Sequence, residues 1–241
     1  IMKNNFKNIL KKHAKSFYFS GLLLDKQTLN DAAVLYAFCR QLDDAADNYD
    51  SDKSNELKNL IQDYKQPVSL NLVNQSFKKI QIKYGLKQIF IDDLISGVSS
   101  DTKFKQPQNL QELLFYSYQV AGTVGALMTK VLGANDQNAE RFAIDLGIGM
   151  QLTNISRDIK EDSINNRIYI PKDMLPNGFS LEDILNDKNK ECIFNATHQI
   201  LNIAERYYQS GIDGIYFIPH KNRFSILIAA ILYNSIGTKI L

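Results

Sequence analysis

The stretch that most constrains the fold of this chain is QLTNISRDIKED, residues 151–162. At the turn of an α-helix, about 100° per residue, Gln151, Asn154, Asp158 and Asp162 fall within an arc of about 80°. The apolar residues nearby lie beside this polar stripe rather than opposite it. Carboxylate and amide groups that border an apolar helical face predict the rim of a cavity. The neighbouring apolar residues are Ile148, Leu152, Ile155 and Ile159.

A second stretch, YAFCRQLDDAAD at residues 36–47, has the same design. Tyr36, Arg40, Asp43 and Asp47 share an arc of about 60° on a helix, again beside an apolar face. A single acidic pair at i and i+4 is common on helix faces that simply contact water, so a solvated surface is the alternative interpretation of each stretch. Two such pairs, each crowding like charges, favour a functional site.

The two acidic pairs indicate a cation and a phosphate. Carboxylates at i and i+4 project side by side, and oxygen ligands of this kind suit Mg²⁺, which keeps waters and takes further oxygens from substrate phosphate. Basic side chains near both stretches could neutralise the charge that develops when a phosphate ester bond breaks. The chemistry implied is ionisation of a diphosphate. The basic residues are Arg40, Arg157, Lys160 and Arg167.

Helical spacing continues through almost the whole chain, and strand-like alternation is nearly absent, so we predict an all-α fold with one domain, 1–241. Thr28 with Asp31 resembles a capping box, as does Ser180 with Asp183. Polar loops are expected at 99–108 and 165–178. The expected helices cover 3–20, 28–49, 54–65, 71–98, 109–128, 135–163, a short stretch after Ser180, 189–217 and 221–239.

Two glycines, Gly122 and Gly125, stand inside the expected helix 109–128. Each costs about 1 kcal/mol of helix propensity against alanine. Something else must therefore require them, and a close approach to the backbone is the best candidate. The approaching group is either another helix or a substrate.

The composition excludes several classes of protein. The 28 basic and 26 acidic residues are interspersed, without a basic block typical of nucleic-acid binding. Cys39 and Cys192 lie in apolar helical patterns, so neither a disulfide framework nor a zinc site is indicated. The start lacks the pattern of a secretory signal, and the apolar segment 224–233 is too short to span a bilayer and is expected to be a core helix. We expect a cytoplasmic protein.

Five motifs then resemble the squalene/phytoene synthase family, whose members join two prenyl diphosphates head to head and include dehydrosqualene and hydroxysqualene synthases. The resemblance covers nearly the whole chain and implies an isoprenoid-synthase helical bundle around a central cavity, with Mg²⁺ bridging diphosphate to both acidic helices. The motifs stand in the family's order: HAKSF (13–17), YAFCRQLDDAAD (36–47), YSYQVAGTVG (116–125), QLTNISRDIKED (151–162) and RIYIP (167–171).

The resemblance assigns roles to individual positions. Tyr116 matches a tyrosine near the reacting carbons, whose hydroxyl could stabilise or deprotonate a carbocation; a buried aromatic with one hydrogen bond is the alternative. The implied metal ligands are Asp43, Asp47, Asn154, Asp158 and Asp162, and the implied catalytic residues are Tyr116, Arg40, Asp43 and Asp158. The implied substrate-binding residues are His13, Ser16, Phe17, Tyr36, Arg40, Val120, Ala121, Gln151, Arg157, Arg167 and Tyr233, and further pocket walls are Phe19 and Leu127.

The chain also departs from the family pattern. After Tyr233 it reads NSIGTKIL and ends at Leu241, where many members continue; Asn166 replaces a common glycine and Ser156 a common apolar residue. Neither of the two replacements, Asn166 and Ser156, touches an implied ligand. Arg157 lies off the polar stripe, and helical geometry alone does not explain its role.

The expected reaction joins two farnesyl diphosphates through a cyclopropylcarbinyl diphosphate to a C30 product of the squalene, dehydrosqualene or hydroxysqualene type. The alternatives are a phytoene synthase that uses geranylgeranyl diphosphate and a non-catalytic assembly factor; the second is disfavoured because all four aspartates are present. The sequence does not indicate whether NADPH is used or which oligomer forms. A very apolar product is compatible with peripheral membrane contact, and no nucleic-acid partner is expected.

Overall fold

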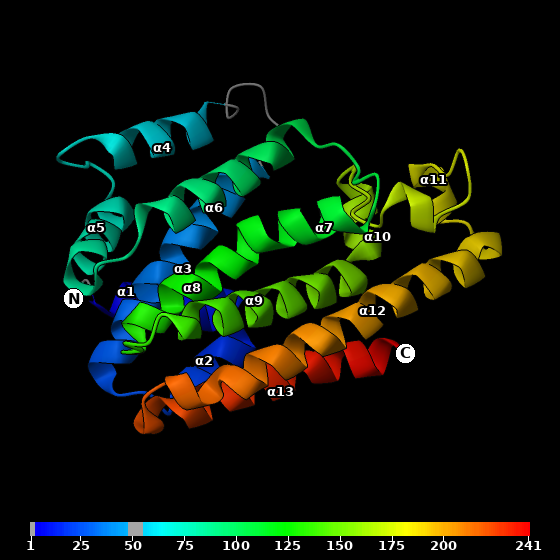
Figure 1. Ribbon diagram of the computed structural model, residues 1–241. Coiled ribbons are helices and arrows are strands. Elements are labelled where there is room, and N and C mark those ends of the chain that lie inside the picture. The colour runs from blue at the N-terminus through cyan, green and yellow to red at the C-terminus, as the bar shows by residue number, and fades with distance from the viewer. Residues whose placement is uncertain (1–2, 48–54) are drawn as a thin grey trace.

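The computed structural model describes residues 3–47 and 55–241, and helices occupy most of both ranges (Figure 1). These residues contain no strand, which confirms the all-α prediction. The α-helices are α1 (Lys3–His13), α2 (Lys15–Gly21), α3 (Lys26–Ala46), α4 (Glu56–Lys65), α5 (Leu72–Tyr84), α6 (Gln88–Ser100), α7 (Leu110–Ser117), α8 (Thr123–Val131), α9 (Asn138–Arg157), α10 (Ile159–Ile164), α11 (Leu181–Ile184), α12 (Lys190–Asp213) and α13 (His220–Ile240).

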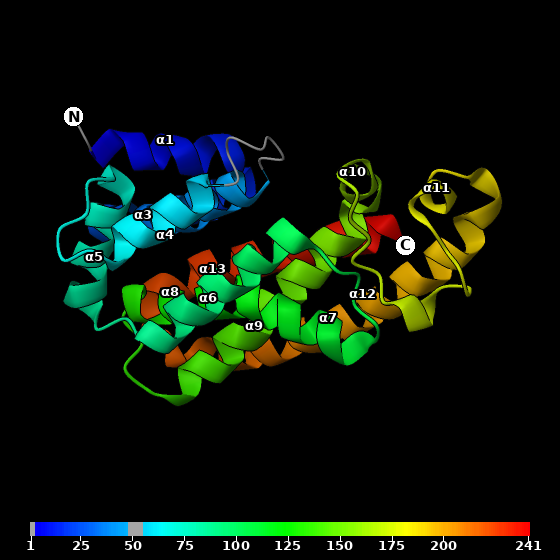
Figure 2. The same ribbon diagram turned by 90° about the horizontal axis from the view of Figure 1, so that it is seen from above.

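Helix α9 is the centre of the bundle, since it packs against α8, α12 and α13. Figure 2 shows α1, α3 and α4 along one side of the molecule and α7, α9 and α12 along the other. One buried apolar cluster surrounds α3, where the rings of Phe38 and Phe77 stack with their centroids 3.8 Å apart. A second lies between α9 and α12 around Leu152, Ile200 and Tyr208. These clusters bury the apolar faces beside both predicted polar stripes.

Several helix ends follow local sequence signals. Asn109 caps α7 by accepting a hydrogen bond from the backbone of Glu112, and Ser180 with Asp183 forms the predicted capping box of α11. The predicted start at Thr28 is wrong, because Asp25 caps α3 and accepts hydrogen bonds from the backbone of Gln27 and Thr28. The predicted end of this helix near residue 49 lies outside the described residues.

Three expected helices are interrupted. The stretch 3–20 breaks at Ala14, whose φ of −140° and ψ of 66° are not helical, and 71–98 breaks at Gly85, whose φ of 60° is in the left-handed region. The stretch 135–163 turns at Asp158, with φ of −100° and ψ of 12°. The turn is slight, since backbone hydrogen bonds still run from Asp158 to Asn154 and from Asp162 to Asp158.

The glycines of the expected helix 109–128 serve helix packing. A methyl group on Gly125 would lie 2.8 Å from the carbonyl carbon of Ala143, and one on Gly122 would lie 3.1 Å from the side chain of Ile144. The backbones of α8 and α9 are therefore in direct contact. This confirms the close approach predicted from the cost of these glycines, with a neighbouring helix as the approaching group.

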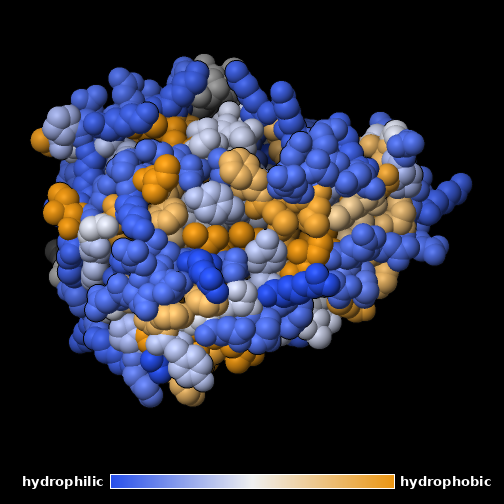
Figure 3. Space-filling view, in the orientation of Figure 1, coloured by the Kyte–Doolittle hydropathy of each residue, from blue (hydrophilic) through white to orange (hydrophobic). Residues whose placement is uncertain are grey.

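The surface is mainly hydrophilic on the face shown in Figure 3, with hydrophobic side chains gathered near its middle, over α7 and α9. The apolar segment 224–233 lies on α13 and is only half core. Ala229 and Ala230 are buried, but Phe224 and Ile231 are exposed. None of the helices in the described part of the chain is both long and apolar enough to cross a bilayer.

Candidate active site

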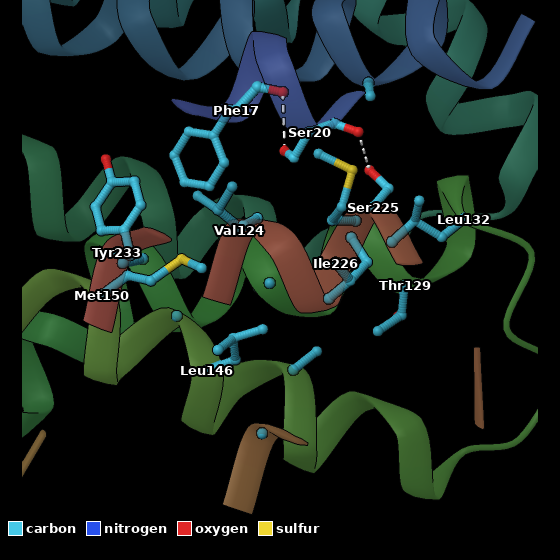
Figure 4. A pocket seen from close by; sticks show the side chains of 18 of the residues that line it. Phe17, Ser20, Val124, Thr129, Leu132, Leu146, Met150, Ser225, Ile226 and Tyr233 are labelled. Atoms are coloured by element: carbon cyan, nitrogen blue, oxygen red, sulfur yellow. Dashed lines mark hydrogen bonds between the residues drawn. The ribbon is translucent and has the colours of Figure 1, made fainter. Parts of the chain in front are cut away.

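A cavity of about 280 Å³ lies between α2, α3, α8, α9 and α13. Its polar end is formed by Tyr36, Gln151, Asn154 and Tyr233, and its deep end is apolar. Figure 4 shows Phe17 and Tyr233 facing each other; their rings stack with centroids 4.8 Å apart. Further along the wall the hydroxyl of Ser225 donates a hydrogen bond to the carbonyl of Ser20. The deep end is lined by Met128, Thr129, Leu132, Ala139, Ile215 and Ile218.

The structure places some of the predicted wall residues at the cavity and others away from it. Phe17, Val120 and Ala121 line the cavity. The expectation is wrong for Phe19, which is 63% exposed, and for Leu127, which is buried in the core around α3. Both lie on helix faces turned away from the cavity.

A π-helical segment, η2 (Tyr118–Gly122), joins α7 to α8 and carries two of the wall residues, Val120 and Ala121. Single π turns inside α-helices occur frequently at functional sites, because the wider turn redirects the side chains that follow it. The sequence shows no periodic signal for it. It turns the middle of the YSYQVAGTVG motif toward the cavity.

The two acidic motifs approach the polar end from different elements, with Asp43 and Asp47 at the end of α3 and Asp158 and Asp162 around the α9–α10 turn. Arg157 binds Asp158 through two hydrogen bonds of 2.7 and 2.6 Å and also bonds to the hydroxyl of Tyr233. Arg157 therefore reaches Asp158 and Tyr233 through its long side chain, although its helical position lies off the stripe.

Asp101 and Arg167 connect the two motifs. Arg167 forms an ion pair of 2.6 Å with Asp47, and Asp101 accepts hydrogen bonds of 2.9 Å from the hydroxyls of both Tyr116 and Tyr169. Burial raises the pKa of Asp101 and holds the pKa of Tyr116 well above its usual range. The Tyr116 hydroxyl is thus a neutral donor held by a carboxylate. It lines a separate, more open cleft of about 800 Å³ rather than the apolar cavity.

The sequence interpretation missed Asp101 and Tyr169. Asp101 stands directly after α6, in the short 3₁₀ turn η1 (Asp101–Lys103), and was assigned to a polar loop. A lone acid that follows an apolar helix was the available signal. Tyr169 belongs to the RIYIP motif. Nothing in its position in the sequence relates its side chain to that of Tyr116.

The structure places three other predicted residues outside the lining of the cavity. Arg40 forms an ion pair of 2.6 Å with Asp44. His13 is the exposed last residue of α1, and Ser16 lies half-buried at the start of α2. Neither lines the cavity, and the break at Ala14 separates them.

Residues 10–241 match the family model described as squalene/phytoene synthase. The chain belongs to the squalene/phytoene synthase family. It is 30% identical to the 15-cis-phytoene synthase of Enterobacter agglomerans, with 94% of this chain and 82% of the relative covered. It is also 30% identical to that of a Paracoccus strain, with 94% and 78% covered.

Solved structures agree with this assignment. The fold is similar to that of a dehydrosqualene synthase at 27% identity, with a TM-score of 0.86 over 97% of this chain and 83% of the other. A squalene synthase from Alicyclobacillus acidocaldarius shares the fold at 18% identity, with a TM-score of 0.86 over 99% and 92%. The chain is therefore a prenyltransferase of a family that condenses prenyl diphosphates head to head.

The family generally uses a divalent metal, and the acidic residues of this chain fit one. Burial raises the pKa of Asp43 to about 7, with Asp47 and Asp101 nearby, and raises that of Asp162 to about 7, with Asp158 nearby. Among the residues that the structure describes, none donates a hydrogen bond to the buried Oδ1 of Asn154. Crowded carboxylates and an unsatisfied amide oxygen are the groups that a hard cation would satisfy.

The same residues limit how a cation could be held. Within residues 3–47 and 55–241, no three His, Cys, Asp or Glu side chains come together closely enough to hold a metal ion. A cation at either motif would complete its ligands with water and phosphate oxygens, as Mg²⁺ commonly does.

Proposed function

We propose that this prenyltransferase condenses two identical allylic prenyl diphosphates head to head, with their diphosphates at the polar rim and at least one prenyl chain in the apolar cavity. The observation that supports this most directly is that each aspartate pair begins one helical turn beyond a residue that lines a largely apolar cavity, Asp43 after Cys39 and Asp158 after Asn154. Such a site separates a charged head from a long apolar tail. An assembly factor without activity would need neither feature.

Two kinds of group at the rim would stabilise the negative charge of the departing diphosphate. Arg40, Arg157 and Arg167 are the cations available to the departing diphosphate. Mg²⁺ held by Asp43, Asp47, Asn154, Asp158 and Asp162 would supply Lewis-acid stabilisation of the same charge. The cavity beside them has an apolar wall, which keeps water from the allylic carbons.

Tyr116 and Asp101 form the pair best suited to act on a cationic intermediate. Asp101 holds the Tyr116 hydroxyl at 2.9 Å, so the oxygen of Tyr116 carries extra negative charge that can stabilise a carbocation. The raised pKa of Tyr116 favours this electrostatic role over removal of a proton.

The depth of the cavity favours a longer substrate than the farnesyl diphosphate expected from the sequence. Its walls on α9 extend from Asn154 to Ala139, about 22 Å at a rise of about 1.5 Å per residue. With carbon–carbon bonds of about 1.5 Å, an extended isoprene unit spans about 5 Å, so three units need about 15 Å and four need about 20 Å. Four units match the length of this wall more closely than three do, and the 30% identical relatives are phytoene synthases. We therefore propose geranylgeranyl diphosphate as the preferred substrate.

The test is to incubate the purified protein with Mg²⁺ and labelled farnesyl or geranylgeranyl diphosphate, with and without NADPH, and to identify the extracted lipids. The expected result is a C40 product from geranylgeranyl diphosphate at the higher rate. A higher rate to a C30 product would restore the farnesyl assignment. Absence of C30, C40 and cyclopropyl products with both substrates would refute the condensation itself.

A further inference from the structure

Helices α2 and α13 both line the cavity, and both also expose large apolar side chains. On α2 and the turn after it, Phe19, Leu22 and Leu23 are 63%, 54% and 51% exposed; on α13, Phe224 and Ile231 are 69% and 60% exposed. We call these five residues, with the outward sides of the two helices, the α2–α13 face. Helix α13 runs along the lower edge of the molecule in Figure 1.

The outward and inward sides of α13 are well separated. At about 100° per residue, Phe224 and Ile231 lie within about 20° of each other. The cavity-lining residues lie on the opposite half of the helix. They are Ser225, Ile226, Ala229 and Tyr233.

Three contacts hold α2 and its following turn against α13. Tyr233 stacks on Phe17, Ser225 bonds to Ser20, and the ammonium group of Lys221 lies 3.1 Å from the carboxylate of Asp25. These contacts run along the length of α2 and hold it beside α13.

The two segments that form α1, α2 and α13 differ sharply in charge from the rest of the chain. Residues 1–26 contain six lysines and one acid, and residues 214–241 contain three basic residues and no acid. These two segments hold nine of the 28 basic residues and one of the 26 acidic ones, a formal charge of +8, which leaves −6 on the remainder. Helices α1, α2 and α13, which these segments form, pack against one another through α2.

We propose that the α2–α13 face docks on an anionic lipid bilayer. Exposed aromatic and aliphatic side chains within a basic surround are the features that insert into the headgroup region and attract anionic lipids. The apolar region over α7 and α9 seen in Figure 3 lacks a basic surround. Residues 110–157, which include these two helices, contain four acidic and three basic residues.

Docking in this orientation would place the cavity one helix layer away from the bilayer. A very apolar product could then leave between α2 and α13 without crossing water. This role in product release rests on the proposed function, whereas binding to the bilayer does not.

The test is co-sedimentation of the protein with vesicles of phosphatidylcholine alone or mixed with phosphatidylglycerol, without substrate or Mg²⁺. We expect binding to the anionic vesicles, weak binding to the neutral ones, and a loss of binding as salt is raised from about 0.1 M to about 1 M. No binding to either vesicle, or equal binding to both, would overturn the proposal.

Double substitutions test whether the α2–α13 face is the surface that binds the bilayer. Phe19→Ser with Phe224→Ser should lower the affinity for anionic vesicles about tenfold or more, and so should Lys12→Glu with Lys239→Glu. The matched controls are Ile89→Ser with Ile82→Ser and Lys58→Glu with Lys188→Glu, which alter exposed residues elsewhere and should leave binding unchanged. Equal loss in tests and controls would place the bilayer on another surface and refute this one.

A second copy of the chain is the competing occupant of this face. Light scattering on the same proteins decides between them. If the wild-type protein forms a dimer that Phe19→Ser with Phe224→Ser dissociates, and it does not bind vesicles, the proposal fails. Condensation measured in detergent should be unchanged in all these variants, so loss of vesicle binding and failure of the proposed reaction are separate results.

Discussion

Replacement of Asp43 by asparagine should stabilise the metal-free protein while it removes activity. Burial raises the pKa of Asp43 from 3.8 to about 7. The folded state therefore holds this proton more tightly than the unfolded state. The stability that the neutral carboxyl of Asp43 contributes is fully present below pH 3.8. It is lost as the pH rises through about 7, above which Asp43 is ionised in both the folded and the unfolded state.

The size of the effect follows from the shift. About three pKa units at about 1.4 kcal/mol each set an upper limit of about 4 kcal/mol. Because the side chain is only half-buried at the rim, solvent screening reduces this to about 2 kcal/mol. For a chain of this size, Asp43→Asn should raise the melting temperature by about 4–8 °C at pH 8, and by less at pH 5.

The assay is urea and thermal unfolding of both proteins at pH 5 and pH 8 in a chelator, repeated with Mg²⁺. Mg²⁺ should stabilise the wild-type protein more than Asp43→Asn, since the variant lacks the carboxylate. The matched control is Asp44→Asn, at the exposed neighbouring residue, whose stability should change by less than about 0.5 kcal/mol. If Asp43→Asn is no more stable than the wild type at pH 8, or gains equally at both pH values, the argument from burial is wrong.

Four further changes test other parts of the site. Gly125→Ala should cost about 1–3 kcal/mol in thermal unfolding, because its methyl group would lie 2.8 Å from the carbonyl carbon of Ala143 and force α8 from α9; unchanged stability would contradict the contact. Asp101→Asn and Tyr116→Phe should each lower kcat about tenfold or more with little change in KM, and the double variant should be as active as either single variant. If the two losses add in the double variant, the two side chains do not act as a pair. Asp158→Asn should abolish diphosphate release with unchanged helix content by circular dichroism, and retained turnover would remove Asp158 from the ligand set. Ala139→Leu, at the deep end, should slow geranylgeranyl diphosphate more than farnesyl diphosphate; equal rates would show that the substrate does not reach this depth.

Periodicity predicted those parts of the site that lie on regular helices. Asp43 and Asp47 occupy one face of α3, and Gln151 and Asn154 line the cavity from α9, because an i, i+4 pattern translates directly into a shared direction on a helix. The same reasoning explained why Gly125 must be small.

The parts that could not be predicted depend on tertiary geometry or on small departures from the helix. The turn at Asp158 keeps its backbone hydrogen bonds to either side, so the pattern of apolar residues continues through it unchanged and gives no sign that α9 ends there. Asp101 meets Tyr116 and Tyr169 only because α6, α7 and the RIYIP segment converge. A helical wheel contains no information about such a meeting.

Each acidic motif combines one aspartate that is ion-paired with an arginine and one aspartate whose pKa is raised by burial. This arrangement affects how a cation and a diphosphate can bind to the site. One aspartate of each pair binds an arginine, Asp47 with Arg167 and Asp158 with Arg157, while burial raises the pKa of the other, Asp43 or Asp162, to about 7. A diphosphate that draws an arginine away leaves an uncompensated carboxylate, and a cation that takes the carboxylate leaves an uncompensated arginine. Each ligand alone therefore meets a cost that the other removes, so cation and diphosphate should bind together more tightly than either binds alone.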